Sequence, residues 1–369
     1  MEPVCRALSS DNVNLRKNID NLLLPHLLKA TPEAFWTLIS VFQSDSNKGF
    51  VTKDEYRLHA LITTIKVGRS LDLIDGESLV NGSSVDKKNN RLIHTQFLYD
   101  SMYHPDKMLR VDALGLLCES HKRTSSINSI EISLLKEFIS LNLNSTLPEF
   151  RQRLLAHFTK LFSRLHGNLY GQWKEYLGKK KAYGDVEAVI KIKRRVDEIE
   201  HFLRWLIHLL VQQLYPGASY QRVSTSLKLL HLLIKSFGVD STPPPTGYTI
   251  KHGKLPEFPF RLPFTTPQLS LTLFNLLMNS YVPNRQEAYD ALRTFPAPLP
   301  GIESEEQAQG VLNWAFIKLK SGRAAESDSG AMVFRIVFVK YVVELGFELE
   351  VDNEMSGAGT VKLTGVPSG

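Results

Sequence analysis

The segment STLPEFRQRLLAHFTKLFSRL, residues 145–165, carries the pattern that decides the fold. Thr146 and Glu149 have the spacing of a helix capping box, and Pro148 lies close to the first helical position. The apolar residues that follow recur every three or four positions, which places them on one face of an α-helix. They are Leu154, Leu155, Phe158, Leu161, Phe162 and Leu165. The segment therefore predicts a helix that packs one face against its neighbours.

Two earlier segments have the same design. TPEAFWTLISVF, residues 31–42, starts with a capping threonine and a proline, and HPDKMLRVDALGLLCES, residues 104–120, has a proline near its start. In both segments the apolar residues again fall on one helical face. Periodicity of this kind dominates the chain, and no series of alternating strands accompanies it.

A weak internal repeat links these segments. A short turn that contains proline is followed by an arginine and then by an apolar helix, and the arginine is Arg110, Arg151, Arg222 or Arg285. The first interval is 41 residues, inside the HEAT/armadillo period of about 40–47 residues. The next two, 71 and 63 residues, require insertions or unmarked repeats. We predict an all-α fold, an α-solenoid of HEAT/armadillo-like repeats with inserted loops, in which these arginines bridge adjacent turns. An irregular all-α bundle is the alternative.

Interruptions of the helical pattern set the expected organisation. An N-terminal helical-repeat segment covers residues 1–240 and includes a polar stretch rich in Gly and Ser at 70–91, where we expect a mobile loop. Residues 241–267 hold seven prolines, which predicts an extended connector. Helical repeats continue over 268–350. Residues 351–369 have too little apolar content to pack, so we expect a disordered tail.

Composition narrows the class of protein. The formal net charge is +6 and the pI is about 9.1, which permits an acidic partner such as RNA without requiring one. The only cysteines are Cys5 and Cys118, which is typical of a reducing compartment and excludes a disulfide framework. No run of about eighteen apolar residues occurs, and the N-terminus lacks the apolar core of a signal peptide. We expect a cytoplasmic protein that does not enter a membrane.

Catalytic and metal-binding signatures are missing from the sequence. DSNKGFVTKDEY, residues 45–56, has Phe50 and Tyr56 where a calcium-binding EF-hand loop needs Gly and Glu. There is no HExxH spacing, P-loop or Gly-x-Ser-x-Gly elbow. We therefore expect no enzyme activity, metal, cofactor or small-molecule substrate. A catalytic site assembled from distant segments is the alternative.

The most basic stretch is GKKKAYGDVEAVIKIKRR, residues 178–195, with seven Lys or Arg against two acids. Lys179, Lys180 and Lys181 have few acidic neighbours in sequence and are candidates for contact with an RNA backbone. Arg194 and Arg195 are further candidates. Aromatic side chains lie close in sequence and are able to stack on unpaired bases or to face a neighbouring helix. They are Tyr170, Trp173, Tyr176 and Tyr183.

The second half of this stretch has a structural interpretation as well. Residues 185–214 predict one long helix with an apolar stripe. Its cations have acids one turn away, in the pairs Glu187–Lys191, Lys193–Asp197 and Arg194–Glu198. Such a mixture is typical of a charged helix face in solvent.

From about residue 200 the sequence contains unusual strings. They are YPGASYQR at 215–222, FPAPLPG at 295–301, and Glu326-Ser-Asp328 followed by Phe334-Arg335. In this order, over about 150 residues, they resemble successive segments of the thyroid-adenoma-associated protein family. That family includes the fungal partner subunit of a tRNA ribose 2′-O-methyltransferase.

The resemblance implies an armadillo/HEAT-type scaffold without catalytic residues. Such a subunit helps a separate methyltransferase to act on a ribose in the tRNA anticodon loop, so its expected partners are that catalytic subunit and tRNA. Arg323, Arg335 and Lys340 are candidates for contact with a partner protein. Family members are several times longer, and this chain resembles a middle portion of them. The alternative function is a protein–protein adaptor with no RNA role.

Overall fold

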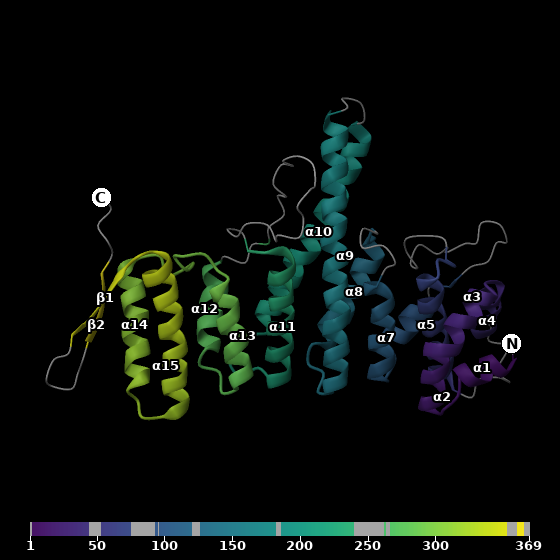
Figure 1. The fold of residues 1–369 in the computed structure, drawn as a ribbon, viewed down its shortest axis with the longest axis horizontal. Helices are drawn as coiled ribbons and strands as arrows, with labels where there is room; N and C mark the ends of the chain where they lie inside the picture. The colour runs from purple at the N-terminus through teal and green to yellow at the C-terminus, as the bar shows by residue number, and fades with distance from the viewer. Residues whose placement is uncertain are drawn as a thin grey trace. The chain divides into compact units, whose positions relative to one another are not determined.

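The computed structural model describes residues 2–43, 53–74, 93–94, 96–119, 126–181, 186–239, 262, 266–352 and 360–364. Over these residues the chain is predominantly helical, as predicted (Figure 1). It forms two compact units, residues 1–199 and 200–369, and the boundary falls inside helix α10 (Val186–Gln212). The two units are called unit 1 and unit 2 below.

Unit 1 consists of helices that pack in pairs, such as α4 with α5 and α7 with α9. The described elements are α1 (Glu2–Leu8), α2 (Val13–Asn18), the π-helical turn η1 (Ile19–Leu23), α3 (Leu24–Ala30), α4 (Glu33–Gln43), α5 (Asp54–Ser70), α6 (Gln96–Met102), α7 (Lys107–Cys118), α8 (Ser129–Asn142), α9 (Pro148–Lys181) and the first part of α10.

Unit 2 begins with the rest of α10 and continues with helices that also pack pairwise, α12 with α13 and α14 with α15. The described elements are α11 (Tyr220–Phe237), α12 (Pro267–Leu276), α13 (Val282–Arg293), α14 (Glu305–Leu319), α15 (Ala324–Val337), the π-helical continuation η3 (Phe338–Glu344), and the strands β1 (Glu348–Asp352) and β2 (Thr360–Thr364).

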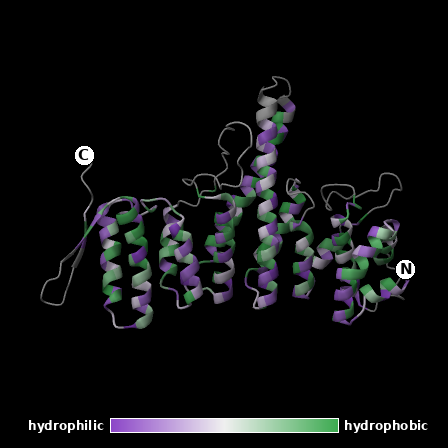
Figure 2. Cartoon of the chain, viewed as in Figure 1, coloured by the Kyte–Doolittle hydropathy of each residue, from purple (hydrophilic) through white to green (hydrophobic). Residues whose placement is uncertain are grey.

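The apolar stripes predicted from the sequence form the core. The stripe residues of α4 are buried, and so are four of α9. They are Phe35, Leu38, Ile39 and Phe42 in α4, and Phe158, Leu161, Phe162 and Leu165 in α9. Burial of each such side chain contributes about 1.5–3 kcal/mol before opposing terms. Figure 2 shows polar and apolar residues on different parts of the same helices. The amphipathic interpretation is confirmed for these segments.

Helix α9 is much longer than its neighbours. Its C-terminal half and the start of α10 extend beyond the ends of α7 and α8 (Figure 1). The connection between α9 and α10 is only residues 182–185, which lie outside the described residues. The described parts of the basic stretch, residues 178–181 and 186–195, are therefore at the projecting end of this helical pair.

Arginines near the starts of helices donate hydrogen bonds to carbonyl groups of the preceding turns. In four places the guanidinium group donates a hydrogen bond to the backbone carbonyl six residues earlier, which lies in the turn between the preceding helix and its own. The pairs are Arg16–Ser10, Arg110–His104 (3.2 Å), Arg151–Ser145 (3.0 Å) and Arg285–Asn279 (2.9 Å). Arg222 differs, because it lies 3.5 Å from the hydroxyl group of Tyr215. The predicted bridging role is confirmed for Arg110, Arg151 and Arg285.

Two further guanidinium groups cover the C-terminal end of α7. Arg164, whose side chain is 2% exposed, donates to the carbonyls of Leu117 (2.7 Å) and Ser126 (2.5 Å). Arg69 donates to the carbonyls of Leu116 (2.5 Å) and Glu119 (3.2 Å). Because a helix C-terminus carries partial negative charge, cations are favourable there. A buried carboxylate, Glu131, lies 3.6 Å from Arg164 and balances its charge.

The prediction of a disordered tail is wrong for residues 360–364. They form strand β2, which pairs antiparallel with β1 and packs on α14. Leu363 is buried, and its backbone N–H donates to Gln309 Oε1 at 2.5 Å. The physical reason is local: Val361 and Leu363 alternate with polar residues, as Leu349 and Val351 do in β1, and this suffices for a short hairpin on a helix.

Two other predicted segments lie largely outside the described residues. Of the loop expected at 70–91, residues 70–74 are described, and Ser70 ends α5. Of the connector expected at 241–267, Leu262, Thr266 and Pro267 are described. Leu262 forms an isolated parallel bridge with Val239, and Thr266 caps α12.

Replacement of Arg164 by Met should destabilise unit 1 by about 3–5 kcal/mol, because it leaves the buried Glu131 without its counter-charge. The change is measured by urea unfolding followed by circular dichroism. Arg194→Met is the matched control in the same unit, since Arg194 is 82% exposed and its loss should change stability by less than about 0.5 kcal/mol. Equal effects of the two substitutions would contradict the role given to Arg164.

Glu119 should give unit 1 an acid-sensitive stability. Burial raises the pKa of this carboxyl group, but hydrogen bonds from His157 and Lys160 outweigh burial and lower its pKa from 4.5 to about 2. The nitrogen–oxygen distances are 3.3 Å to His157 and 2.7 Å to Lys160. Because the folded pKa is depressed, the stabilisation is present above about pH 4.5 and is lost as the pH falls toward 2.

In urea unfolding at pH 5.5 and pH 3, Glu119→Gln should lose less stability on acidification than the original chain does. Asp11→Asn is the control, since Asp11 is exposed in the same unit. A loss on acidification that is as large in Glu119→Gln as in the original chain would show that Glu119 does not carry this effect.

Candidate functional site

The basic candidates from the sequence lie at the projecting end of α9 and α10. The backbone of Lys179, Lys180 and Lys181 forms the last turn of α9, and their side chains lie outside the described residues. Arg194 and Arg195 lie on α10 and are exposed. The structure thus places both groups on the same helical pair, joined by residues 182–185.

Acidic side chains pair with only some of the basic residues in the described part of α10. Of the three ion pairs predicted for the described part of α10, the structure forms Arg194–Glu198, with Nε and Oε1 at 3.4 Å. Arg194 remains 82% exposed in this pair. An exposed pair of this kind contributes about 0–1 kcal/mol, so an incoming anion can compete for the arginine.

Of the neighbouring aromatic side chains, Trp173 and Tyr176 contact each other. Their rings are stacked, with centroids 5.6 Å apart and an interplanar angle of 14°. Both are half-buried in the C-terminal part of α9, as is Tyr170, and Tyr183 lies outside the described residues. A half-buried stacked pair has one part in the core and one part in solvent, so it packs against a neighbouring helix and also presents an aromatic surface to solvent.

The three candidates for a partner protein have different environments. Arg323 is 80% exposed and pairs with Glu326 at 3.1 Å. Arg335 is exposed on α15. The prediction that Lys340 contacts a partner protein is wrong, because this residue lies in η3 and is only 2% exposed. Its ammonium group donates to the carbonyls of Arg293 (2.9 Å) and Phe295 (2.7 Å) and pairs with Glu344 at 2.7 Å.

The unusual strings of unit 2 are held together by polar contacts. Asp328 pairs with the buried Arg285, which joins α15 to α13, and Glu326 pairs with Lys318 of α14 at 3.0 Å. Beside Lys340, the hydroxyl group of Tyr341 donates to the carbonyl of Ile302 and accepts from the N–H of Leu299 at 3.3 Å. Burial raises the pKa of Tyr341 to about 12. These residues therefore fix the FPAPLPG turn and the packing of α13, α14 and α15.

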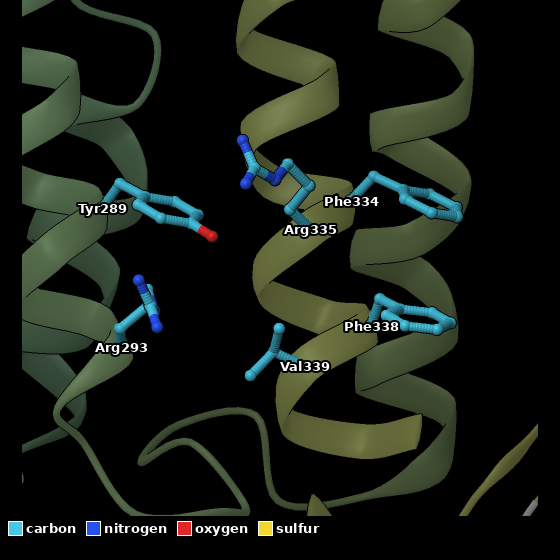
Figure 3. Close-up of a pocket in the computed structure, with 6 residues that line it drawn as sticks. All are labelled: Tyr289, Arg293, Phe334, Arg335, Phe338 and Val339. Carbon is cyan, nitrogen blue, oxygen red and sulfur yellow. The ribbon is translucent and has the colours of Figure 1, made fainter. Parts of the chain in front are cut away.

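A groove of about 270 Å³ lies along α13, α15 and the start of η3, which continues α15 (Figure 3). On the side of α13 it contains two arginines stacked on one ring, with guanidinium carbons 5.9 Å (Arg293) and 5.3 Å (Arg335) from the centre of Tyr289. On the other side of α15, Phe334 and Phe338 are stacked, with centroids 6.4 Å apart at 11°. The lining residues are Tyr289, Arg293, Phe334, Arg335, Phe338 and Val339.

Of these residues the sequence reasoning singled out Arg335 and noted Phe334, and missed the others. The available signal was the four-residue spacing, since Tyr289 and Arg293 share a helix face and so do Phe334 and Phe338. The groove itself depends on how α13 packs against α15, which local spacing does not reveal.

Within the described residues, no three His, Cys, Asp or Glu side chains gather in a way that could hold a metal ion. Among the described helices, none combines the length and the apolar content needed to cross a lipid bilayer.

Residues 1–286 match the family model described as Trm732, TPR repeats. The chain belongs to this family. Together with the packed helix pairs of both units, the match confirms the predicted α-solenoid class. The description names TPR repeats, whereas the spacing of Arg110 and Arg151 indicated HEAT/armadillo-like repeats.

Similar proteins are named "tRNA (32-2'-O)-methyltransferase regulator THADA". The dog protein is 22% identical over 85% of this chain and 15% of its own length. The chicken protein is 26% identical over 65% of this chain and 12% of its own length. The mouse protein is 25% identical over 68% of this chain and 13% of its own length. The chain thus spans a small part of these relatives. A solved structure of an engineered protein aligns with 91% of this chain and with 88% of its own chain, at 12% sequence identity. The TM-score of 0.27 is too low to support a shared fold.

Lys340→Ala should destabilise unit 2 by about 2 kcal/mol or more, because two buried carbonyl groups lose their donor. The change is measured by urea unfolding. Arg323→Ala is the matched control, with an expected change below about 0.5 kcal/mol. If Lys340→Ala left stability unchanged, the structural role of this lysine would be refuted.

Proposed function

We propose that this chain is a non-catalytic, helical-repeat scaffold that assists 2′-O-ribose methylation of the tRNA anticodon loop and acts in the cytoplasm. It would do so by binding a separate methyltransferase, tRNA or both. The observation that carries the proposal is the family match over residues 1–286, supported by relatives that are named regulators of a tRNA methyltransferase.

The fold is compatible with such a role. Helical repeats bury their apolar stripes against neighbouring repeats and present polar helix faces and turns along their length. A scaffold of this kind brings an enzyme and its substrate together by raising their effective concentration. No chemistry needs to come from the scaffold itself.

On this proposal the projecting end of α9 and α10 contacts tRNA. Lys179, Lys180, Lys181, Arg194 and Arg195 supply positive charge close together in sequence, on two helices joined by a short connection. Lysine and arginine side chains that neutralise phosphates release condensed counterions, which favours binding most at low salt. Such contacts position an RNA without reading its bases.

Contact with the methyltransferase is proposed for Arg323, at the start of α15. It is 80% exposed, and its pair with Glu326 lies on the surface. A partner carboxylate would exchange for Glu326 at little cost, because exposed ion pairs contribute little to stability.

The combined change Lys179→Glu, Lys180→Glu and Lys181→Glu should weaken tRNA binding about tenfold or more at about 0.1 M salt. The plot of log affinity against log salt should become shallower by about 2 units, because about three phosphate contacts are lost. Fluorescence anisotropy of labelled tRNA over a salt series measures both quantities.

The matched control replaces three exposed lysines elsewhere in unit 1 by glutamate, which gives the same change in net charge. They are Lys17, Lys29 and Lys53. If both triple variants weaken binding equally, the contact is not at the end of α9. If the original chain and its full-length mouse relative both fail to bind tRNA at low salt, the adaptor without an RNA role is favoured. Methyl transfer to tRNA by this chain with no added methyltransferase would overturn the non-catalytic assignment.

A further inference from the structure

We infer that the groove on α13 and α15 binds one unpaired nucleotide of an RNA, with the phosphate at Arg293 and Arg335 and the base on Phe334 and Phe338. The inference rests on the proposed role in tRNA methylation. It assigns an RNA contact to unit 2, separate from the basic residues of unit 1.

Charge is the first argument. Nearby cations of unit 2 have acidic partners: Arg285 pairs with Asp328, Lys318 with Glu326, and Lys340 with Glu344. Arg293 and Arg335 are exposed, and among the described residues no carboxylate lies within ion-pair distance of either. Positive charge without a counter-charge is thus concentrated on one side of the groove.

The geometry of these two cations suits a phosphate. Both guanidinium groups contact the ring of Tyr289, with their carbons 5.9 and 5.3 Å from its centre, so one side chain positions both cations. Tyr289 is buried, so the ring is a rigid support. The planar guanidinium fork matches the oxygen atoms of a phosphate better than an ammonium group does.

The aromatic side of the groove distinguishes a nucleotide from a simple anion. Phe338 is 39% exposed, and its ring lies parallel to that of Phe334 at 11°. Figure 3 shows the two rings on the side of α15 that faces away from Tyr289, with Val339 on the other side of the helix beside Arg335. Aromatic faces that reach solvent next to arginines are the usual platform for unpaired bases.

Size and alternatives limit the choice of ligand. A groove of about 270 Å³ lies just below the usual range of small-ligand pockets, about 300–1,000 Å³, which suits one base with its phosphate. An acidic peptide would use the two arginines but has no need for a pair of parallel phenylalanine rings. We therefore take a nucleotide as the occupant and test the acidic peptide beside it.

The experiment measures binding of this chain to a 5′-labelled octauridylate by fluorescence anisotropy over a salt series. Arg293→Gln and Arg335→Gln should each weaken binding about threefold to tenfold and reduce the salt slope by about 0.7, the value for one phosphate contact with a single strand. Phe338→Ala should weaken binding by a similar factor without changing the salt slope, because stacking releases no counterions.

Arg204→Gln is the matched control, since it removes one exposed arginine of unit 2 that lies outside the groove. It should leave the affinity within about twofold of the original chain. A second measurement does not depend on mutation: ultraviolet cross-linking of an oligonucleotide with 4-thiouridine should label the peptide that contains Phe334 and Phe338.

Effects of Arg293→Gln and Arg335→Gln no larger than that of Arg204→Gln, with cross-links elsewhere, would overturn the inference and leave the proposed function intact. Binding of octaglutamate that depends on the two arginines, without binding of octauridylate, would overturn it in favour of an acidic peptide. If the chain binds neither octauridylate nor tRNA at low salt, the RNA part of the proposed function fails, and this inference fails with it.

Discussion

Unsatisfied carbonyl groups at helix ends and turns are the constraint on which this structure depends. Stacked helices joined by short turns leave such groups near the core, where each one without a donor costs free energy. The chain meets the need with long basic side chains. Arg110, Arg151 and Arg285 each donate back across the turn before their helix, Arg164 covers the end of α7, and Lys340 reaches the turn after α13. Part of the positive charge of the chain is therefore structural.

This use of cations explains why charge in the sequence is an uncertain guide to ligands. Arg285 and Lys340 look like surface residues by type, yet they are buried between elements and matched by Asp328 and Glu344. Cations that remain exposed without a matched acid are more informative. Arg293 and Arg335 in unit 2 meet that condition, and Arg195 of α10 is exposed in the same way. The fold class alone would not have distinguished these two kinds of basic residue.

The helices could be predicted from the sequence because their signals are local. The stripe of α9 and the start of α4 need only the spacing of residues within one helix, and the structure buries most of those residues. The predicted arginine bridges are also local, six residues long. The burial of Lys340 and its hydrogen bonds could not be predicted in this way, since the carbonyl groups that accept from it are 45 and 47 residues earlier in the chain. For the same reason the groove was missed, because Tyr289 and Arg335 meet only when α13 packs on α15. The strand at 360–364 was missed because its alternation covers only five residues within a polar tail.

Lys340 has a consequence for the groove that it does not line. It donates to the backbone carbonyl of Arg293, whose side chain stacks on Tyr289, so this residue is held at both its backbone and its side chain. Arg335 is held on the same ring. Ordering free arginine side chains normally costs conformational entropy when a ligand binds, about 0.5–1.5 kcal/mol for each. In this groove most of that ordering takes place during folding, so the site is preorganised and its selectivity is set by shape as well as by charge.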